Sequence, residues 1–187
     1  MAKLLIIGSV AAGTSVGAKA RRNSEDLEIT IYDRDEDISY SGCGIPYFVG
    51  GEVAELDELT PRDAAFFKKR YNIDVKTRHN VEAIDHETKT ATIRHLDSSE
   101  TFTDTYDTLV FATGASSIIP PLPGVDLENV FPVRNIRNAD AIRRYVDAQA
   151  PKRAVIVGGG FIGLEMAEQL TYRGIEVTLV ERLTQVM

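Results

Sequence analysis

The chain has 187 residues, of which 43% are hydrophobic, and its formal net charge is −7. This composition is ordinary for a globular protein with a buried core, and the acidic balance argues against nucleic acid or an anionic membrane as a partner. The single cysteine excludes an internal disulfide. No apolar run is long enough for a signal peptide or a membrane span. The three histidines lack the spacing of metal ligands. We therefore expect a cytoplasmic protein without a bound metal.

A dinucleotide-binding pattern opens the chain. Residues 3–7 form a continuous apolar run, typical of a buried parallel strand, and a glycine turn over 8–13 leads into a small-residue helix over 14–22. A second strand over 28–33 ends at Asp33, about twenty residues beyond the turn, where a carboxylate can meet a dinucleotide ribose. Val10 replaces the middle glycine of the pattern. The alternative is a βαβ unit that binds nothing at this turn.

The only cysteine, Cys43, lies in the stretch Ser41-Gly42-Cys43-Gly44-Ile45-Pro46-Tyr47. Gly42 and Gly44 leave its thiol unshielded, and residues 45–50 can form a short helical turn directly after it. The positive end of a helix dipole makes such a thiol more nucleophilic. The alternative is a small buried cysteine without chemistry.

The middle of the chain changes pattern twice. Thr60 is predicted to cap a helix that begins at Pro61 and runs to about Tyr71. Short alternating strands over 81–85, 90–95 and 101–104 predict an antiparallel meander. A buried strand over 108–112 then ends in the Thr113-Gly114 turn, residues 118–124 form a connector, and residues 138–148 form an amphipathic helix.

The opening pattern returns near the end of the chain. A strand over 154–157, a full G-x-G-x-x-G over 158–163, a helix over 164–173 and a strand over 176–180 are closed by Glu181. This unit indicates a second dinucleotide site, and the acid favours NADH over NADPH, although Arg182 beside it weakens that preference. The predicted fold is α/β, with two Rossmann-like units, an antiparallel meander between them and a truncated second unit. We expect an FAD-binding domain over 1–116, a connector and helix over 117–150, and the start of an NAD(P)-binding domain over 151–187.

These motifs, together with Cys43 and the Ala112-Thr113-Gly114 turn, resemble those of the pyridine nucleotide-disulfide oxidoreductases. The resemblance covers essentially the whole chain. It is strongest to the single-cysteine branch, which holds coenzyme A-disulfide reductases, persulfide reductases, and NADH oxidases and peroxidases. It implies that the chain is an N-terminal fragment of a homodimeric parent.

The resemblance also implies a role for specific positions. Cys43 would be the catalytic nucleophile. FAD would be bound by Gly8, Val10, Ala11, Ala12, Gly13, Asp33, Arg34, Val81, Ala112, Thr113 and Gly114. NAD(P)H would be bound by Gly158, Gly160, Phe161, Ile162, Gly163 and Glu181. Coenzyme A would be bound by Ser15, Lys19, Arg22, Ser39 and Gly42.

Two positions depart from the coenzyme A branch, because Gly42 replaces an asparagine and Tyr71 replaces a lysine. For Lys19 and Arg22 the alternative is a solvated helix face.

The main functional hypothesis is an FAD-dependent reductase that passes electrons from NAD(P)H through the flavin and Cys43 to a low-molecular-weight disulfide or persulfide. A second is an NADH oxidase or peroxidase using a cysteine sulfenic acid, although Val10-Ala11-Ala12 lacks the histidine of that branch. A third is a truncated nucleotide-binding fragment without activity.

Overall fold

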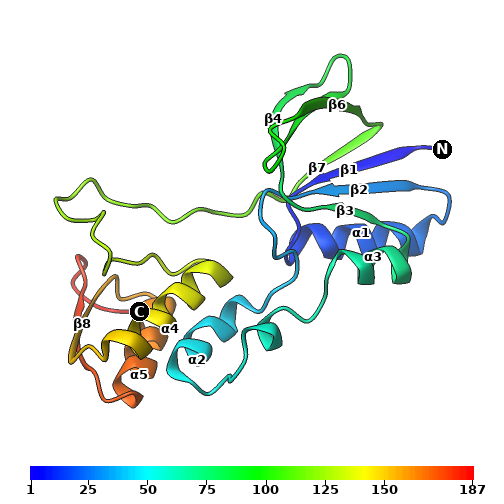
Figure 1. Ribbon diagram of the computed structural model, residues 1–187. Coiled ribbons are helices and arrows are strands. Elements are labelled where there is room, and N and C mark those ends of the chain that lie inside the picture. Colours follow the sequence, from blue (N-terminus) through cyan, green and yellow to red (C-terminus); the bar gives the residue numbers. More distant parts are fainter. The chain divides into compact units, whose positions relative to one another are not determined.

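The computed structural model describes residues 1–187, which form two compact units (Figure 1). The first unit comprises Met1–Tyr40 and Thr60–Ala115, and the second comprises Ser41–Leu59 and Ser116–Met187. The cysteine segment thus belongs to the second unit, whereas the sequence-based boundaries place it within 1–116. The predicted domain boundaries stay a prediction.

A four-stranded parallel sheet forms the centre of the first unit, in the order β3-β2-β1-β7. Its strands are β1 (Lys3–Ile7), β2 (Glu28–Tyr32), β3 (Asp74–Lys76) and β7 (Thr108–Phe111). In this register Ile6 lies between Ile31 and Val110. The apolar run therefore becomes a strand with neighbours on both sides. The sequence analysis did not predict β3, which has only three residues and no alternation to reveal it.

Each face of this sheet is covered by a different layer (Figure 1). Helices α1 (Ala12–Asn23) and α3 (Ala64–Tyr71) pack on the face that carries Leu4 and Ile6. The opposite face, which carries Leu5, packs against the meander of β4 (His79–Asp85), β5 (Thr90–His95) and β6 (Thr101–Thr105). Both pairings in the meander are antiparallel, as predicted.

The predicted start of α3 is wrong. The helix begins at Ala64 rather than Pro61, and its cap is Asp63 rather than Thr60. The Asp63 carboxylate accepts a hydrogen bond from the Phe66 N–H at 2.8 Å, and its backbone is extended. A carboxylate at this position satisfies one of the unpaired N–H groups of the first turn and meets the positive helix end, so it defines the start.

The second unit packs three helices around a small core. They are α2 (Ile45–Gly50), α4 (Ile136–Gln149) and α5 (Phe161–Tyr172), and Val49 is fully buried among residues of the other two. Parallel strands β8 (Arg153–Val157) and β9 (Glu176–Val180) form the predicted second βαβ unit around α5. Helix α4 begins two residues before its predicted start, because Asn135 and Asn138 form a capping box. No helix combines the length and apolar character needed to cross a bilayer.

Candidate active site

The first glycine turn is closed by contacts that only glycine permits. Gly8 has φ +91°, its N–H donates to the Tyr32 carbonyl at 2.8 Å, and a Cβ there would lie 2.2 Å from the Ala112 carbonyl oxygen. A Cβ on Gly13 would lie 1.9 Å from the Gly8 oxygen. The structure therefore brings Gly8, Gly13 and the Ala112-Thr113 turn together, as the predicted site requires.

Asp33 closes this turn from within the unit. Its side chain is buried and accepts hydrogen bonds from the Ser9 N–H at 2.8 Å, from the Ser9 hydroxyl and from the Asp35 N–H at 2.9 Å. Ser9, itself 2% exposed, was missed by the sequence analysis, although a hydroxyl directly after the first glycine was the available signal. Asp33 therefore fixes the turn, and its remaining lone pairs are what a ribose could use.

Backbone geometry marks Val10 as unusual. Its φ is +41°, a left-handed conformation in which a β-branched residue is strained, and the Thr14 hydroxyl donates to its carbonyl. Helix α1 then begins after Ala11, which provides no side-chain cap. The N–H groups of the first turn are therefore without a capping side chain, and an anion such as a pyrophosphate fits this helix end.

Other predicted FAD residues surround the acid. Arg34 follows Asp33 directly and is exposed. The His79 N–H donates to the Asp33 carbonyl at 2.9 Å, which places the start of β4 beside the acid. Val81 lies two residues further along that strand and is half-buried.

The second glycine turn repeats the first. Gly158 has φ +113° and donates to the Val180 carbonyl at 2.9 Å, and a Cβ on Gly163 would lie 2.0 Å from the Gly158 oxygen. The Gly159 N–H donates to Glu181 at 2.6 Å, as the Ser9 N–H does to Asp33. Each unit therefore uses its closing acid to brace its own turn.

The start of α5 is open to a ligand. Gly160 caps this helix without a side-chain hydrogen bond, and a Cβ there would meet no atom nearer than the Met187 sulfur at 3.9 Å. Phe161 and Ile162 follow it and are exposed. A dinucleotide phosphate can therefore approach the backbone here.

Glu181 is held in its charged form. Hydrogen bonds from the backbone N–H groups of Leu183, at 2.8 Å, and Gly159 lower the pKa of its carboxyl, and the positive charge of Arg182 acts in the same direction. A charged acid in this position repels a phosphate and accepts hydrogen bonds from hydroxyl groups.

Cys43 is exposed at the centre of a 3-10 turn, Gly42–Gly44, which leads directly into α2. A Cβ on Gly42 would meet nothing within 4 Å, so this glycine leaves the thiol unshielded. Position 44 is a glycine for a different reason, because a Cβ on Gly44 would lie only 2.5 Å from a methyl group of Leu59. Cys43 is therefore not buried within this chain.

A hollow of about 180 Å³ in the first unit contains two arginines. It brings together Ser15 and Arg22, two of the residues predicted for coenzyme A, whereas Lys19 and Ser39 do not line it. Its full lining is Thr14, Ser15, Ala18, Arg22, Arg62, Phe67 and Tyr71. Arg62 was missed because it precedes the helix cap, outside any motif. Guanidinium groups, hydroxyls and aromatic rings in one place suit a phosphate-bearing ligand with a flat base.

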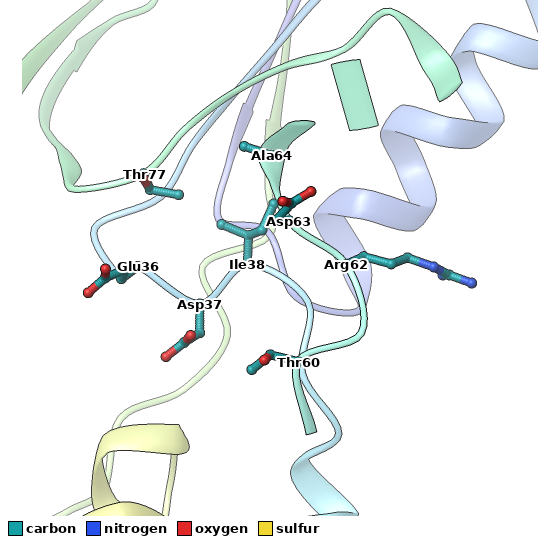
Figure 2. Close-up of a pocket in the computed structure, with 8 residues that line it drawn as sticks. All are labelled: Glu36, Asp37, Ile38, Thr60, Arg62, Asp63, Ala64 and Thr77. Atoms are coloured by element: carbon teal, nitrogen blue, oxygen red, sulfur yellow. The ribbon is translucent and has the colours of Figure 1, made fainter. Parts of the chain in front are cut away.

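A larger hollow, of about 260 Å³, lies beside it and has a different character. Figure 2 shows Glu36 and Asp37 on the loop after β2, and Arg62 extends away from both acids. Carboxylates repel phosphate, so the smaller hollow is the better candidate for a nucleotide-like substrate.

Residues 2–187 match the sequence profile of the family described as pyridine nucleotide-disulphide oxidoreductase. The chain belongs to this family. The resemblance seen in the motifs is therefore confirmed, and so is the α/β fold with its parallel and antiparallel sheets.

Among family members, the coenzyme A disulfide reductase of Staphylococcus haemolyticus is 38% identical over 186 residues, which cover 100% of this chain and 42% of that protein. The NADH oxidase of Methanocaldococcus jannaschii is 39% identical over 186 residues, which cover 99% of this chain and 41% of that protein. The crystal structure of reduced CoADR-RHD from Bacillus anthracis matches with a TM-score of 0.95 at 43% identity, over 99% of this chain and 33% of that one. The chain thus spans about two fifths of the curated relatives it matches.

Proposed function

We propose that the complete protein is an FAD-dependent reductase that takes electrons from NAD(P)H and passes them through Cys43 to a low-molecular-weight disulfide. The observation that carries this proposal is one exposed thiol in a chain with two equivalent glycine turns, each braced by an acid. Two dinucleotide sites and one thiol form a path for two electrons. The family membership supports it.

Both cofactors suit the turns described above. FAD would lie with its pyrophosphate at the start of α1 and its adenosine near Asp33, and NAD(P)H would lie at the start of α5 near Glu181. When bound, the flavin would accept a hydride from the nicotinamide and supply an electron pair to Cys43 in its oxidised, disulfide-bonded form. The chain's own residues bind and orient these groups.

Cys43 would act as the nucleophile. Its thiolate attacks one sulfur of the disulfide, so a bond forms between the Cys43 sulfur and that sulfur while the other half leaves as a thiolate. An electron pair that originates in NAD(P)H then breaks the mixed disulfide, releases the second thiolate and restores the Cys43 thiolate. One disulfide, one NAD(P)H and one proton thus give two thiols and NAD(P)⁺.

Coenzyme A disulfide is the proposed substrate. The hollow with Arg22 and Arg62 presents two guanidinium groups, and coenzyme A carries several phosphates next to an adenine. The relative from Staphylococcus haemolyticus, a coenzyme A disulfide reductase, favours the same substrate. A persulfide of a small thiol is the closest alternative, since the same nucleophile can attack it.

Steady-state assays on the complete protein test this proposal. We expect NADH oxidation to depend on coenzyme A disulfide and to be slow with oxygen as the only acceptor. Cys43→Ser should abolish disulfide turnover and leave flavin binding intact, because serine fits the space but does not ionise near neutral pH. Equal turnover of oxygen and the disulfide, or full activity of the serine variant, would overturn it.

The second candidate is an NADH oxidase or peroxidase in which Cys43 forms a sulfenic acid. The NADH oxidase among the relatives favours it, whereas Val10-Ala11-Ala12 lacks the histidine expected in that branch. A sulfenate-specific reagent that labels Cys43 during turnover, with no mixed disulfide in the intact mass, would support it.

A third candidate is that the 187-residue chain alone only binds nucleotide or is inert. Its absorbance spectrum separates these cases. A flavin spectrum after purification would reject the inert fragment, and a colourless protein that stays colourless with added FAD would reject flavin binding by the chain alone.

For the complete protein we propose a homodimer, which light scattering would test.

A further inference from the structure

The helix that follows Cys43 has its C-terminal end bound by two arginines from distant parts of the chain. Arg143 of α4 donates from Nη1 to the Phe48 carbonyl at 3.0 Å and to the Val53 carbonyl at 2.8 Å. Arg173, directly after α5, donates from Nη1 to the Val49 carbonyl at 3.2 Å. The last carbonyls of a helix lack a partner within the helix, and arginine side chains are favourable at this negative end. The Phe48 carbonyl also accepts from the Gly51 N–H at 3.2 Å, so Arg143 adds a second hydrogen bond there.

Asp147 joins the two arginines into one group. Its carboxylate accepts from Arg173 Nη2 at 2.5 Å and lies 3.7 Å from Arg143 Nε. The arginine side chains are 23% and 24% exposed, and the Arg143 guanidinium lies 4.5 Å from the centre of the Phe48 ring. We call Arg143, Asp147 and Arg173 the arginine clamp.

Helix α2 needs such a restraint because it has only six residues. A helix this short is not stable on its own in water, so its orientation depends on what holds it. The buried Val49 fixes its depth in the core, and Gly50 packs tightly on Gln169, where a Cβ would lie 1.8 Å from the amide oxygen. Apolar burial is non-directional, whereas hydrogen bonds from planar guanidinium groups fix rotation.

We propose that Arg143, Asp147 and Arg173 are positioning residues for Cys43. They hold the C-terminal end of helix α2 and so set its orientation, and the N-terminal end of this helix directly follows the Cys43 turn. This inference rests on the proposed role of Cys43 as nucleophile. The clamp touches neither substrate nor cofactor in this role. Its loss should misplace the thiol and leave both dinucleotide turns unchanged.

Substitutions in the complete flavin-loaded protein test the clamp. Arg143→Met keeps an apolar stem on Phe48 but removes both hydrogen bonds, and Arg143→Lys keeps the charge without the planar fork. Arg173→Met tests the second arm. Arg144→Met is the matched control, since Arg144 is the neighbouring residue on α4, its side chain is 79% exposed, and it pairs with Asp140 of the same helix.

Three readouts separate positioning from folding. We expect coenzyme A disulfide turnover in Arg143→Met and Arg173→Met to fall by about tenfold to a hundredfold, as for a displaced reacting group. The long-wavelength absorbance of a thiolate beside oxidised flavin, measured per bound flavin after two-electron reduction, should weaken in parallel. The rate at which NADH bleaches the flavin should stay unchanged. Arg143→Lys should recover part of both losses, and Arg144→Met should behave as wild type.

Several outcomes would overturn the inference. Wild-type turnover and absorbance in both methionine variants would show that the clamp does not position the thiol. An equal fall in flavin bleaching and turnover would indicate general misfolding, and so would the same loss in Arg144→Met. Asp147→Asn provides a milder variant that should fold and show an intermediate loss, and wild-type behaviour there would count against the role of the acid. Failure of the proposed function itself would appear separately, as disulfide turnover by Cys43→Ser.

Discussion

Lys3, Tyr32 and Asp104 form a polar group at the sheet of the first unit. Lys3 Nζ lies 2.5 Å from Asp104 Oδ1, and the Tyr32 hydroxyl donates to Asp104 Oδ2 at 2.8 Å. Burial pushes the pKa of the Asp104 carboxyl upward, but the hydrogen bonds from Lys3 and Tyr32 outweigh it and leave the pKa below its usual value. Burial together with this carboxylate raises the pKa of Tyr32.

This group predicts how stability depends on pH. A carboxyl whose pKa is lower in the folded state stabilises the fold above its unfolded pKa, and this contribution is lost as pH falls through the folded pKa. Asp104→Asn should therefore lower the free energy of unfolding by about 1–2 kcal/mol at pH 7 and by much less near pH 3. Urea denaturation of the wild type and the variant at both pH values measures this difference in the free energy of unfolding. The exposed Asp97, paired with Arg78, supplies the control Asp97→Asn, and an equal penalty at both pH values would contradict the prediction.

Glu181 predicts the choice between NADH and NADPH. Its charge should repel a 2′-phosphate, so Glu181→Gln should raise the NADPH to NADH ratio of kcat/KM by about tenfold. Glutamine keeps an oxygen that can accept from the Gly159 N–H, so the turn stays braced while the charge is lost. Steady-state kinetics of the complete protein with both coenzymes provide the test. An unchanged ratio would mean that the acid does not face the ribose.

At the scale of elements, the hollow that contains Arg22 and Arg62 is lined by α1, by α3 and by the segment just before α3, and Arg62 is the residue to test. Arg62→Ala should raise the KM for coenzyme A disulfide by about tenfold, because a charge-assisted contact to phosphate is lost. The KM for pantethine, a disulfide with the same reactive end and no phosphate, should not change. Arg94→Ala removes an exposed arginine of the meander and is the control. Equal effects on both substrates would contradict a phosphate contact.

Local patterns predicted most elements of this fold. Apolar runs predicted β1, β7 and β8, the alternating stretches predicted the meander, and the glycine turns were placed correctly because their spacing follows from backbone geometry. The acids at 33 and 181 could also be placed, since each ends a strand.

Contacts between distant residues could not be predicted in this way. The Arg143 and Arg173 contacts to α2 join residues 95 and 124 positions apart, and no local pattern encodes such a pairing. The docking of the cysteine helix on α4 and α5 was missed for that reason. Asp63 was missed as a cap because Thr60-Pro61 is an equally good local signal, and Arg62 belongs to the hollow only through the tertiary fold.

At the scale of the whole molecule, the two glycine turns are equivalent and should be separable. Gly13→Ala places a Cβ 1.9 Å from a carbonyl oxygen, so it should abolish flavin retention, measured by absorbance, while NADH affinity is kept. Gly163→Ala places a Cβ 2.0 Å from the Gly158 carbonyl oxygen. It should abolish NADH binding while flavin is retained. Gly17→Ala is the control on α1, since its nearest neighbour is a flexible isoleucine methyl at 3.2 Å. Loss of both ligands in either variant would contradict separate sites.

The path of the chain between the two units has a consequence for folding. The chain leaves the first unit after Tyr40, returns to it at Thr60 and leaves again after Ala115. The core of the second unit therefore needs Val49, which is synthesised long before Ile142, Met166 and Leu170, its partners. Residues 116–187 expressed alone would expose these side chains to water, and contacts this far apart form slowly. During synthesis the segment that carries Cys43 is therefore present but unanchored until α4 and α5 have emerged.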